Sequence, residues 1–321
     1  MRAAIIGYGV IGRVHAKVIP NYAELIAICD INEEVFKDDK CPRVAHYTDW
    51  KKMLDEVRPD AVHICTPHYL HAEMVIEALG RGINVLCEKP LCIREEDIGR
   101  ILEAEKNSTA QLGVCQQNRY NASNAAIKKY IEGKKVEVGV GQVSWHRDAA
   151  YYASGAWRGK WDTEGGGVLI NQSLHTLDLM QWFCGMPDEL SATVANHTLK
   201  ESIEVEDTAA ILCRGEAGNF NFFATIGTSR DCPIDITLKV GDEWIKIMPK
   251  YTVIGDKLMK YEDIGPVWGK ACYGSGHDAL VGDWYDCLGS GRKFPIDGNE
   301  GAKVIRLILA AYKSGGNAVK I

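Results

Sequence analysis

The chain has 321 residues, of which 46% are hydrophobic and 25% are charged, and its formal net charge at neutral pH is -6. This composition is typical of a globular protein and excludes a mostly disordered or fibrous chain. Lysine and arginine are scattered along the sequence, so the chain lacks the basic stripe that attracts nucleic acids or anionic membranes. We therefore expect no nucleic-acid partner. Because the length exceeds what one hydrophobic core usually supports, two domains are expected.

The cysteines and the first residues indicate where the protein works. There are 11 cysteines, and no two of them form a C-x-x-C pair, so we expect neither a disulfide framework nor a zinc-ligand cluster. The chain reaches Gly7 before a signal-type apolar core could form, and no run of about 18 apolar residues follows. We expect a cytoplasmic protein with reduced thiols and no membrane association.

In the first third of the chain, short apolar runs alternate with stretches of helical periodicity. Such alternation is typical of β-α-β units that build a parallel sheet, and apolarity along a whole run indicates that both faces of a strand are covered. The predicted strands cover residues 2–6, 24–29, 61–65, 83–87 and 111–115, and the clearest predicted helices cover 69–79 and 94–106. The first domain is expected to end at residue 119.

After Asn121 the pattern changes to period-two alternation, which indicates antiparallel strands with one covered face. Predicted strands cover residues 136–146, 190–196, 207–214, 220–226, 234–240 and 243–248, and predicted helices cover 125–131, 172–183, 278–288 and 300–312. We expect residues 120–321 to form an α+β domain with a large, open-faced, mainly antiparallel sheet.

The first predicted strand runs directly into Gly7-Tyr8-Gly9-Val10-Ile11-Gly12. In the Rossmann βαβ unit, the first glycine of such a motif makes a tight turn, the second lets a pyrophosphate approach the backbone, and the third lets the helix pack close to the strand. The helix N-terminus then supplies unpaired N–H groups and partial positive charge for the phosphates. We assign these six residues to a dinucleotide site. The alternative is a glycine-rich turn without a ligand.

Asp30 ends the second predicted strand, 18 positions after Gly12. A carboxylate at this position accepts hydrogen bonds from the adenosine ribose hydroxyls, and its charge repels a 2′-phosphate. Ile31 and Asn32 follow, so no arginine is present there to receive that phosphate. NAD is therefore expected rather than NADP, although Asp30 could instead cap the helix that begins near Glu33.

Lys89 lies in Cys87-Glu88-Lys89-Pro90, at the end of the fourth clear strand. The carboxyl ends of parallel strands are where an open α/β sheet binds its ligands, and a following proline favours an extended conformation for Lys89. We expect its ammonium group to lie near the nicotinamide. A lysine in this place can also be a solvated charge, and the position alone leaves both interpretations open.

Five segments, taken in order, resemble one family, the Gfo/Idh/MocA oxidoreductases, which include glucose–fructose oxidoreductase and inositol dehydrogenase. These segments are Gly7-x-Gly9-x-x-Gly12 with His15, Thr66-Pro67-x-x-Leu70-His71, Glu88-Lys89-Pro90, Gly165-Gly166-Gly167-Val168-Leu169-Ile170-Asn171-Gln172-x-x-His175-x-x-Asp178, and Gly276-His277 with Asp283 and Gly291-Arg292. The resemblance spans nearly the whole chain. It implies an NAD-binding Rossmann domain followed by an open-faced α/β domain, with a sugar or cyclitol bound between them.

The resemblance also implies roles for individual residues. Lys89 matches the catalytic lysine of the family, and Asn171 and His175 match two positions where many members carry Asp and His. An amide takes no proton at neutral pH, so Asn171 can orient a substrate hydroxyl but cannot serve as its base. His175, with an ordinary pKa near 6.5, is then the expected base, and Lys89 favours the developing alkoxide. By itself, His175 could be a core histidine.

Further candidate contacts lie around these groups. Thr66, Pro67, His71 and Glu88 are expected beside the nicotinamide, as in relatives, and possible substrate contacts are Arg119, Tyr120, Trp157, Arg158, Trp161 and His277. For each possible substrate contact, a structural role is the alternative, such as a tryptophan that anchors a surface loop. His68-x-x-His71 has no third ligand at a suggestive spacing, so no metal is expected.

The favoured hypothesis is NAD-dependent oxidation or reduction at a secondary alcohol of a sugar, sugar derivative or cyclitol. Two alternatives remain: a glycosidase-like elimination assisted by tightly held NAD, which the asparagine at position 171 motivates, and a non-catalytic NAD-binding sensor. We also expect a homodimer or homotetramer, because the exposed face of an open sheet is an aggregation liability unless a second copy covers it. The substrate, the direction of the reaction and the choice between dimer and tetramer are not determined by the sequence.

Overall fold

The computed structural model describes residues 1–321 except 38–43, 263–264 and 268–273. The chain divides into two compact units: the first unit consists of Met1–Gln117 with Gly265–Ala302, and the second of Asn118–Ile264 with Lys303–Ile321. The expected domain of residues 120–321 therefore differs from the observed division. The reason is that the helix after residue 275 packs within the first unit, where its Trp284 lies against Gly113 and its Gly282 against the ring of Tyr22.

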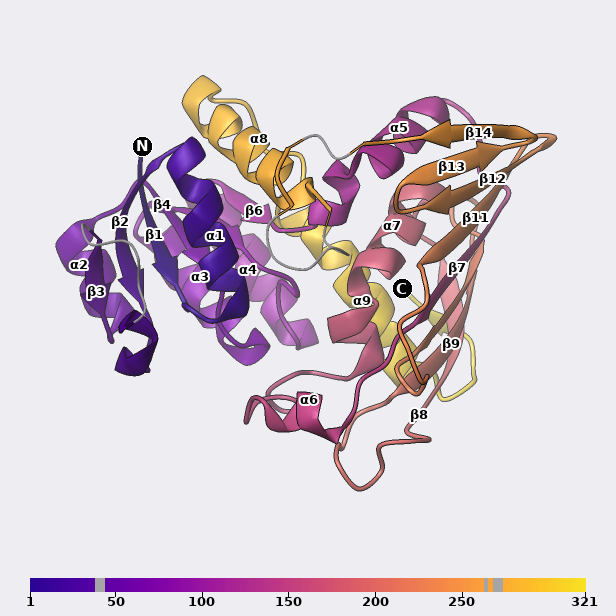
Figure 1. Cartoon of the computed structure of the whole chain (residues 1–321), viewed down its shortest axis with the longest axis horizontal. Coiled ribbons are helices and arrows are strands. Elements are labelled where there is room, and N and C mark those ends of the chain that lie inside the picture. The colour runs from indigo at the N-terminus through magenta and orange to yellow at the C-terminus, as the bar shows by residue number, and fades with distance from the viewer. Residues whose placement is uncertain (38–43, 263–264, 268–273) are drawn as a thin grey trace. The chain divides into compact units, whose positions relative to one another are not determined.

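A parallel sheet of six strands, in the order β3-β2-β1-β4-β5-β6, forms the centre of the first unit (Figure 1). This is the strand order of a Rossmann fold, and it confirms the predicted parallel sheet. Residues at the centre of β1, such as Ala4 and Ile5, are fully buried, as expected from continuously apolar runs. The strands are β1 (Arg2–Ile6), β2 (Glu24–Cys29), β3 (Ala45–Tyr47), β4 (Ala61–Ile64), β5 (Asn84–Cys87) and β6 (Leu112–Val114).

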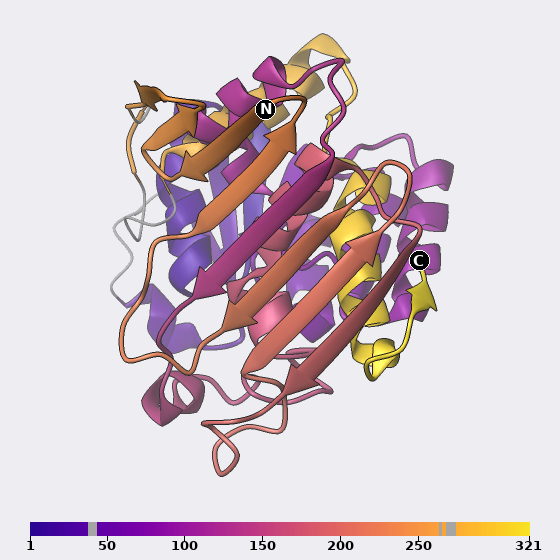
Figure 2. The ribbon, with the colours of Figure 1, turned by 90° about the vertical axis from the view of Figure 1, so that its right-hand side faces the viewer.

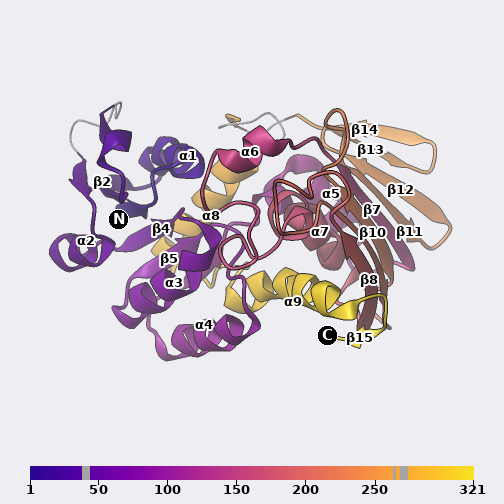
Figure 3. The same ribbon diagram turned by 90° about the horizontal axis from the view of Figure 1, so that it is seen from below.

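Helices cover both faces of this sheet. Figure 3 shows α1 and α8 on one face and α3 and α4 on the other. Asp49 caps α2 by accepting hydrogen bonds from the N–H groups of Lys51 and Lys52. The helices are α1 (Val10–Val18), α2 (Trp50–Val57), α3 (His71–Gly80), α4 (Glu95–Asn107) and α8 (Gly276–Ser290), with short turns η1 (Ile19–Asn21), η2 (Glu33–Phe36) and η3 (His68–Leu70).

The second unit contains a nine-stranded sheet in the order β14-β13-β12-β11-β7-β10-β9-β8-β15. Only β7 and β10 pair in parallel within the described residues, which confirms the expectation of a mainly antiparallel sheet. The strands are β7 (Val138–Ser144), β8 (Glu189–Ala195), β9 (Thr208–Arg214), β10 (Phe220–Thr225), β11 (Asp235–Val240), β12 (Glu243–Met248), β13 (Tyr251–Ile254), β14 (Lys257–Lys260) and β15 (Val319–Lys320). The last three were not predicted.

One face of this sheet is covered and the other is open. Helix α7 packs against β7, where Gly139 and Gly141 make room: an added Cβ would lie 2.6 Å from Cys184 Sγ and 2.8 Å from Met180 Sδ, respectively. Figure 2 shows the opposite face, which no helix of the described residues covers. The remaining helical elements are η4 (Gln117–Tyr120), α5 (Ala122–Tyr130), α6 (Ala149–Ala153), the π-helical turn η5 (Val168–Gln172), α7 (Leu174–Cys184) and α9 (Gly298–Ser314).

Among the described helices, none combines the length and the apolar composition that crossing a bilayer requires.

Candidate functional site

The glycine-rich turn of the first unit connects β1 to α1, and backbone packing explains two of its glycines. Gly7 has a φ of +92°, which favours glycine, and a Cβ on it would lie 2.6 Å from the carbonyl oxygen of Cys65. A Cβ on Gly12 would lie 2.0 Å from the carbonyl oxygen of Gly7. These contacts agree with the expected roles of a tight turn and of close packing between helix and strand.

Gly9 differs from the other two, because a Cβ added there would meet no atom of the described residues within 4 Å. The glycine therefore leaves open space directly before the N-terminus of α1, for which Gly9 is the N-cap without a side-chain hydrogen bond. Val10, which follows Gly9, and Ile31, which follows Asp30, are 72% and 89% exposed although both are apolar. Open backbone, unpaired helix N–H groups and exposed apolar side chains fit a bound dinucleotide.

Asp30 follows β2 at the same edge of the sheet. Its Oδ2 accepts a hydrogen bond from the backbone N–H of Tyr8 at 2.7 Å, and its Oδ1 accepts one from the N–H of Asn32 at 2.9 Å. Each carboxylate oxygen has a second lone pair, so this fixed group can still accept a ribose hydroxyl. The ring of Tyr8 is itself buried beneath the guanidinium of Arg13, 4.6 Å from the ring centre. Asp30 is therefore held by the turn and does not cap a helix.

Lys89 lies just after β5, in a loop held by two neighbours. Its backbone N–H donates to Glu88 Oε2 at 3.1 Å, and its peptide bond to Pro90 is cis. His71 Nδ1 lies 2.6 Å from the carbonyl oxygen of Pro90, and His71 Nε2 lies 2.8 Å from that of Thr66. Because burial lowers the pKa of His71, the neutral ring donates to one of these carbonyls at neutral pH. The loops after β4 and β5 are thereby joined.

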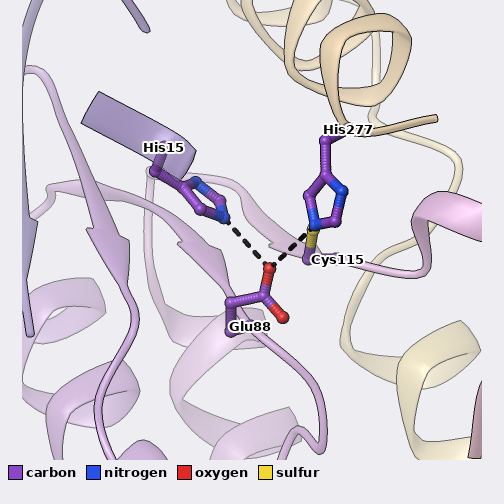
Figure 4. A group of neighbouring side chains, drawn as sticks. All are labelled: His15, Glu88, Cys115 and His277. Atoms are coloured by element: carbon purple, nitrogen blue, oxygen red, sulfur yellow. Dashed lines mark hydrogen bonds and ion pairs between the residues drawn. The ribbon is translucent and has the colours of Figure 1, made fainter. Parts of the chain in front are cut away.

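The carboxylate of Glu88 lies between two histidines (Figure 4). Its Oε1 is 3.0 Å from His15 Nε2 on α1 and 3.5 Å from His277 Nε2 on α8, and all three side chains are buried. Burial would raise the pKa of Glu88, but the hydrogen bonds from the two histidines outweigh it and hold that pKa well below its usual range. Glu88 is therefore ionised beside Lys89.

A chain of hydrogen bonds continues from His15 into the interior. His15 Nδ1 lies 2.7 Å from His63 Nδ1, and His63 Nε2 lies 2.9 Å from the hydroxyl of Tyr285. Burial and the neighbouring His15 lower the pKa of His63 well below 6.5, so His63 is neutral. If Tyr285 donates to His63 and His63 to His15, then His15 donates to Glu88, and each of these polar atoms has a partner.

Side chains with metal-binding chemistry also meet at Glu88. Ligand atoms of His15, Glu88, Cys115 and His277 lie within 4.8 Å of one another, and all four residues are buried (Figure 4). Nitrogen, oxygen and sulfur atoms of this kind suit zinc. The contacts of Glu88 with both histidines engage the same atoms without an ion. His68 and His71, the pair considered from the sequence, have ring centres 6.1 Å apart.

In the second unit, Asn171 lies in the last turn of η5 and His175 in the first turn of α7. Within the segment from Val168 to Cys184, only Asn171, His175 and Trp182 are partly exposed, and every other residue is buried. The two predicted polar groups are therefore the accessible groups at the start of an otherwise largely buried helix. This exposure does not fit a histidine enclosed in the core.

Asn171 is held by its neighbours. Its Nδ2 donates to Glu164 Oε1 and to the hydroxyl oxygen of Tyr151, the latter at 3.3 Å. Arg158 Nη1 also donates to the Tyr151 oxygen, at 2.6 Å. Glu164 is fully buried, and its Oε2 accepts from the backbone N–H of Gly159.

A second buried carboxylate supports the glycine run that precedes Asn171. Glu206 accepts hydrogen bonds from the N–H groups of Gly167 at 2.8 Å and Leu169 at 2.9 Å, and from the hydroxyl of Tyr312 at 3.0 Å. Burial raises the pKa of Glu206 to about 7, although these donors oppose the rise.

Three of the predicted substrate contacts lie in the loop that precedes the glycine run. Arg158 lies between the rings of Trp157 and Tyr151, with its guanidinium carbon 4.5 Å and 4.6 Å from the ring centres. Trp161 donates from Nε1 to the carbonyl of Glu204 at 3.1 Å and meets Tyr312 edge-on, which favours the interpretation as a loop anchor.

Arg119 is buried and bound to both carboxylate oxygens of Asp178, at 2.7 Å and 2.6 Å. This pairing ties it to α7 and leaves a substrate-binding role without support from the geometry. Its neighbour Tyr120 is partly exposed. His277, another predicted substrate contact, lies beside Glu88.

Sequence reasoning missed several of these groups. Three residues that surround the glycine run were not identified from the sequence, namely Glu164, Tyr151 and Glu206. His63, which continues the chain of hydrogen bonds from His15, was also not identified. For Glu164 a signal existed, because an acidic residue stands directly before three consecutive glycines.

Comparison with known proteins identifies the family. Residues 1–116 match the family described as "Oxidoreductase family, NAD-binding Rossmann fold", and residues 125–257 match the "GFO/IDH/MocA C-terminal domain". D-glucoside 3-dehydrogenase of Escherichia coli is 28% identical over 58% of this chain and 55% of its own length. Myo-inositol 2-dehydrogenase of Thermotoga maritima is 26% identical over 68% of this chain and 66% of its own length. The aligned parts thus span between about half and two thirds of these relatives.

Solved structures match over the whole chain. The WlbA dehydrogenase of Bordetella pertussis, in complex with NADH and UDP-GlcNAcA, is 27% identical with a TM-score of 0.86, covering 100% of this chain and 98% of that one. Levoglucosan dehydrogenase in complex with NADH and levoglucosan has a TM-score of 0.88 at 20% identity, covering 100% and 99%, and shares the fold. Since the two family matches together span most of the sequence, the chain belongs to the Gfo/Idh/MocA family of NAD-binding oxidoreductases.

Proposed function

We propose that this protein is an NAD(H)-dependent dehydrogenase that transfers hydride to or from a secondary alcohol carbon of a sugar, a sugar derivative or a cyclitol. The observation that carries the proposal is the arrangement at the carboxyl edge of the parallel sheet. There, the open backbone at Gly9 and the fixed carboxylate of Asp30 provide for a dinucleotide, and the loop after β5 carries Lys89 at the same edge.

Three side chains divide the proposed chemistry. His175 removes the hydroxyl proton with a ring nitrogen, and the ammonium of Lys89 stabilises the negative charge that develops on that oxygen. Asn171 orients the substrate by hydrogen bonding to a neighbouring hydroxyl. NAD⁺, when bound, accepts the hydride from the carbon. In the reverse direction NADH, when bound, would supply the hydride, protonated His175 gives its proton to the oxygen of the ketone, and Lys89 again stabilises the negative charge on that oxygen.

Further residues support these groups. We propose that Thr66, Pro67, His71 and Glu88 shape the nicotinamide end of the cofactor site, since His71 joins the two loops that contain them. Trp157, Arg158 and Tyr120 are proposed substrate contacts, and Arg158 offers a guanidinium between two aromatic faces. The substrate class rests on the names of relatives that act on glucosides and inositol.

Purified protein incubated with NAD⁺ and a panel of aldoses, glycosides and cyclitols tests the proposal. We expect NADH absorbance at 340 nm to rise with at least one of them. If the protein binds NADH but no compound raises the absorbance at 340 nm, the dehydrogenase proposal fails. Release of an aglycone without net NADH would then indicate the elimination chemistry, and absence of both reactions would indicate a sensor.

We also propose a cytoplasmic homodimer or homotetramer formed through the open face of the large sheet. That face carries apolar residues that are each 37% to 52% exposed to solvent, namely Val138, Val140, Leu212, Phe223 and Trp244. The nine cysteines in the described part of the chain are free thiols, which suits a reducing compartment. Light scattering coupled to size-exclusion chromatography should give a dimer or tetramer, and a monomeric mass would refute the pairing of sheets.

A further inference from the structure

Glu164 is a fully buried carboxylate whose two oxygens both face donors. Oε2 accepts from the backbone N–H of Gly159, and Oε1 accepts from Nδ2 of Asn171. Burying a carboxylate is costly unless its oxygens are hydrogen-bonded. The position is therefore specified by polar partners rather than by apolar packing.

The chemistry of these partners requires a carboxylate rather than an amide. A carboxylate accepts at both oxygens, whereas a glutamine would present one N–H group to a donor. Gly159 cannot adjust easily, because its φ is +72° and a Cβ there would lie 2.6 Å from Ile203 Cγ2. If a glutamine replaced Glu164, its N–H group would therefore face Asn171, whose amide can rotate to accept from it.

Asn171 is in turn oriented by what accepts from it. Its Nδ2 group points at Glu164 and at the hydroxyl oxygen of Tyr151, which also receives hydrogen bonds from Arg158 and from Gln172 Nε2 at 3.3 Å. With Nδ2 committed to these acceptors, the carbonyl Oδ1 of Asn171 lies on the opposite side of the amide. Glu164 thus fixes the orientation of the Asn171 amide, with Nδ2 toward Glu164 and Oδ1 away from it.

We propose that Glu164 is a positioning residue for the reaction: it locks Asn171 with Oδ1 presented as the acceptor for a substrate hydroxyl. This inference rests on the proposed function, in which Asn171 orients the substrate by accepting from a hydroxyl beside the one whose proton His175 removes. It adds a specificity rule, because such a site selects a hydroxyl donor and rejects a group that can only accept. It also couples the loop of Trp157 and Arg158 to Asn171, since Gly159 and Asn171 share one carboxylate.

Three variants test this lock by turnover: E164Q, N171D and the double variant. In E164Q the oxygen of the new glutamine still accepts from the N–H of Gly159, so its Nε2 group faces Asn171. The amide of Asn171 then rotates, and its Oδ1 accepts from this Nε2 group. We expect kcat/KM to fall about tenfold, which corresponds to the loss of one hydrogen bond, with unchanged Kd for NADH. In the double variant Nε2 of the introduced glutamine donates to the introduced aspartate carboxylate, so kcat/KM should recover relative to E164Q. The exposed Glu204 provides the control, E204Q, which should behave as the wild type.

A merely structural Glu164 would give additive losses in the double variant, and that result overturns the proposal. A kcat/KM for E164Q equal to that of the wild type would also overturn the proposal. Comparing substrates in which the hydroxyl beside the reacting one is replaced by a methoxy group adds a second readout, because E164Q should lose discrimination against the methyl ether.

A measurement without substrate separates failure of this inference from failure of the proposed function. N171D places a second carboxylate against Glu164, so one of the two must hold a proton. Its pKa is then raised in the folded state, and the melting temperature of N171D relative to wild type should fall as pH rises from about 5 to about 8. Glu164 interacts electrostatically with Tyr152 and Tyr312, and Tyr151 contacts Asn171; these described groups are common to all variants.

Adding E164Q to N171D should remove this relative pH dependence. If N171D shows none, the pairing and the inference fail, even when the wild type is active. If the pH dependence appears but the wild type is silent on every substrate, the proposed function fails and the positioning role fails with it, while the pairing stands.

Discussion

Replacing Asp30 with alanine should weaken NADH binding far more than NADPH binding. In the folded protein the Asp30 carboxylate is fixed by the N–H groups of Tyr8 and Asn32, at 2.7 Å and 2.9 Å. It is thus oriented before the cofactor arrives, with lone pairs available for the adenosine ribose. The D30A variant removes these acceptors and the negative charge together.

The size of the effect follows from the hydrogen bonds lost. Hydrogen bonds to a charged group each contribute about 1.5–3 kcal/mol, and part of this is regained when water reaches the partly exposed site. We expect a loss of about 2–3 kcal/mol, which is about a 30- to 150-fold higher Kd for NADH. NADPH should lose less or gain affinity, because the anion that repels its 2′-phosphate is gone.

Calorimetric titration of both cofactors at one salt concentration measures this difference. D30N is the matched control: it keeps the size and one acceptor oxygen but not the charge, and its Kd for NADH should lie between those of wild type and D30A. A folded D30A protein with wild-type affinity for NADH would refute the assignment of Asp30 to the ribose.

Other consequences follow from the same geometry. A Cβ on Gly12 would lie 2.0 Å from a backbone carbonyl oxygen, so G12A should lower the melting temperature, whereas G9A, whose Cβ meets no atom of the described residues, should keep it and lose NADH binding in a fluorescence titration. The pKa of Glu88 and that of His63 are both lowered on folding, so each binds more protons when unfolded. The free energy of unfolding from urea denaturation should therefore fall as pH drops below about 6.5, and further near pH 4, and E88Q should flatten the second part. Because burial raises the pKa of Glu206 to about 7, its contribution to stability should decline as pH rises toward 7, and the melting temperature of E206Q relative to wild type should rise over the same range.

The sequence predicted most of the fold because its strands carry strong local patterns. The central strands of the first sheet are apolar except at Arg2 and His63, and the large sheet alternates clearly, as in the buried and exposed residues of β9. The strands that were missed are short or lack a pattern: β15 has two residues, and all four residues of β14 are exposed. Their existence depends on pairing with neighbouring strands.

The candidate site was predictable only where its chemistry is local. The glycine turn, Asp30 and Lys89 are read from adjacent residues and from their places at strand ends. The partners of Glu88 are His15 and His277, which lie far from it in the sequence on either side, and no periodicity indicates such a meeting. Their convergence also explains why the segment with His277 belongs to the first unit rather than to the expected second domain.

The central claim is that Lys89 stabilises charge on a substrate oxygen while NAD(H) carries hydride. Absorbance at 340 nm, followed for wild type and K89A with an active sugar or cyclitol, tests this claim most directly, after both proteins are shown to bind NADH equally. K106A, which changes an exposed lysine of α4, provides the control. We predict that K89A loses about 10²–10³ in kcat while K106A keeps the wild-type rate. Equal rates for K89A and wild type would contradict the account.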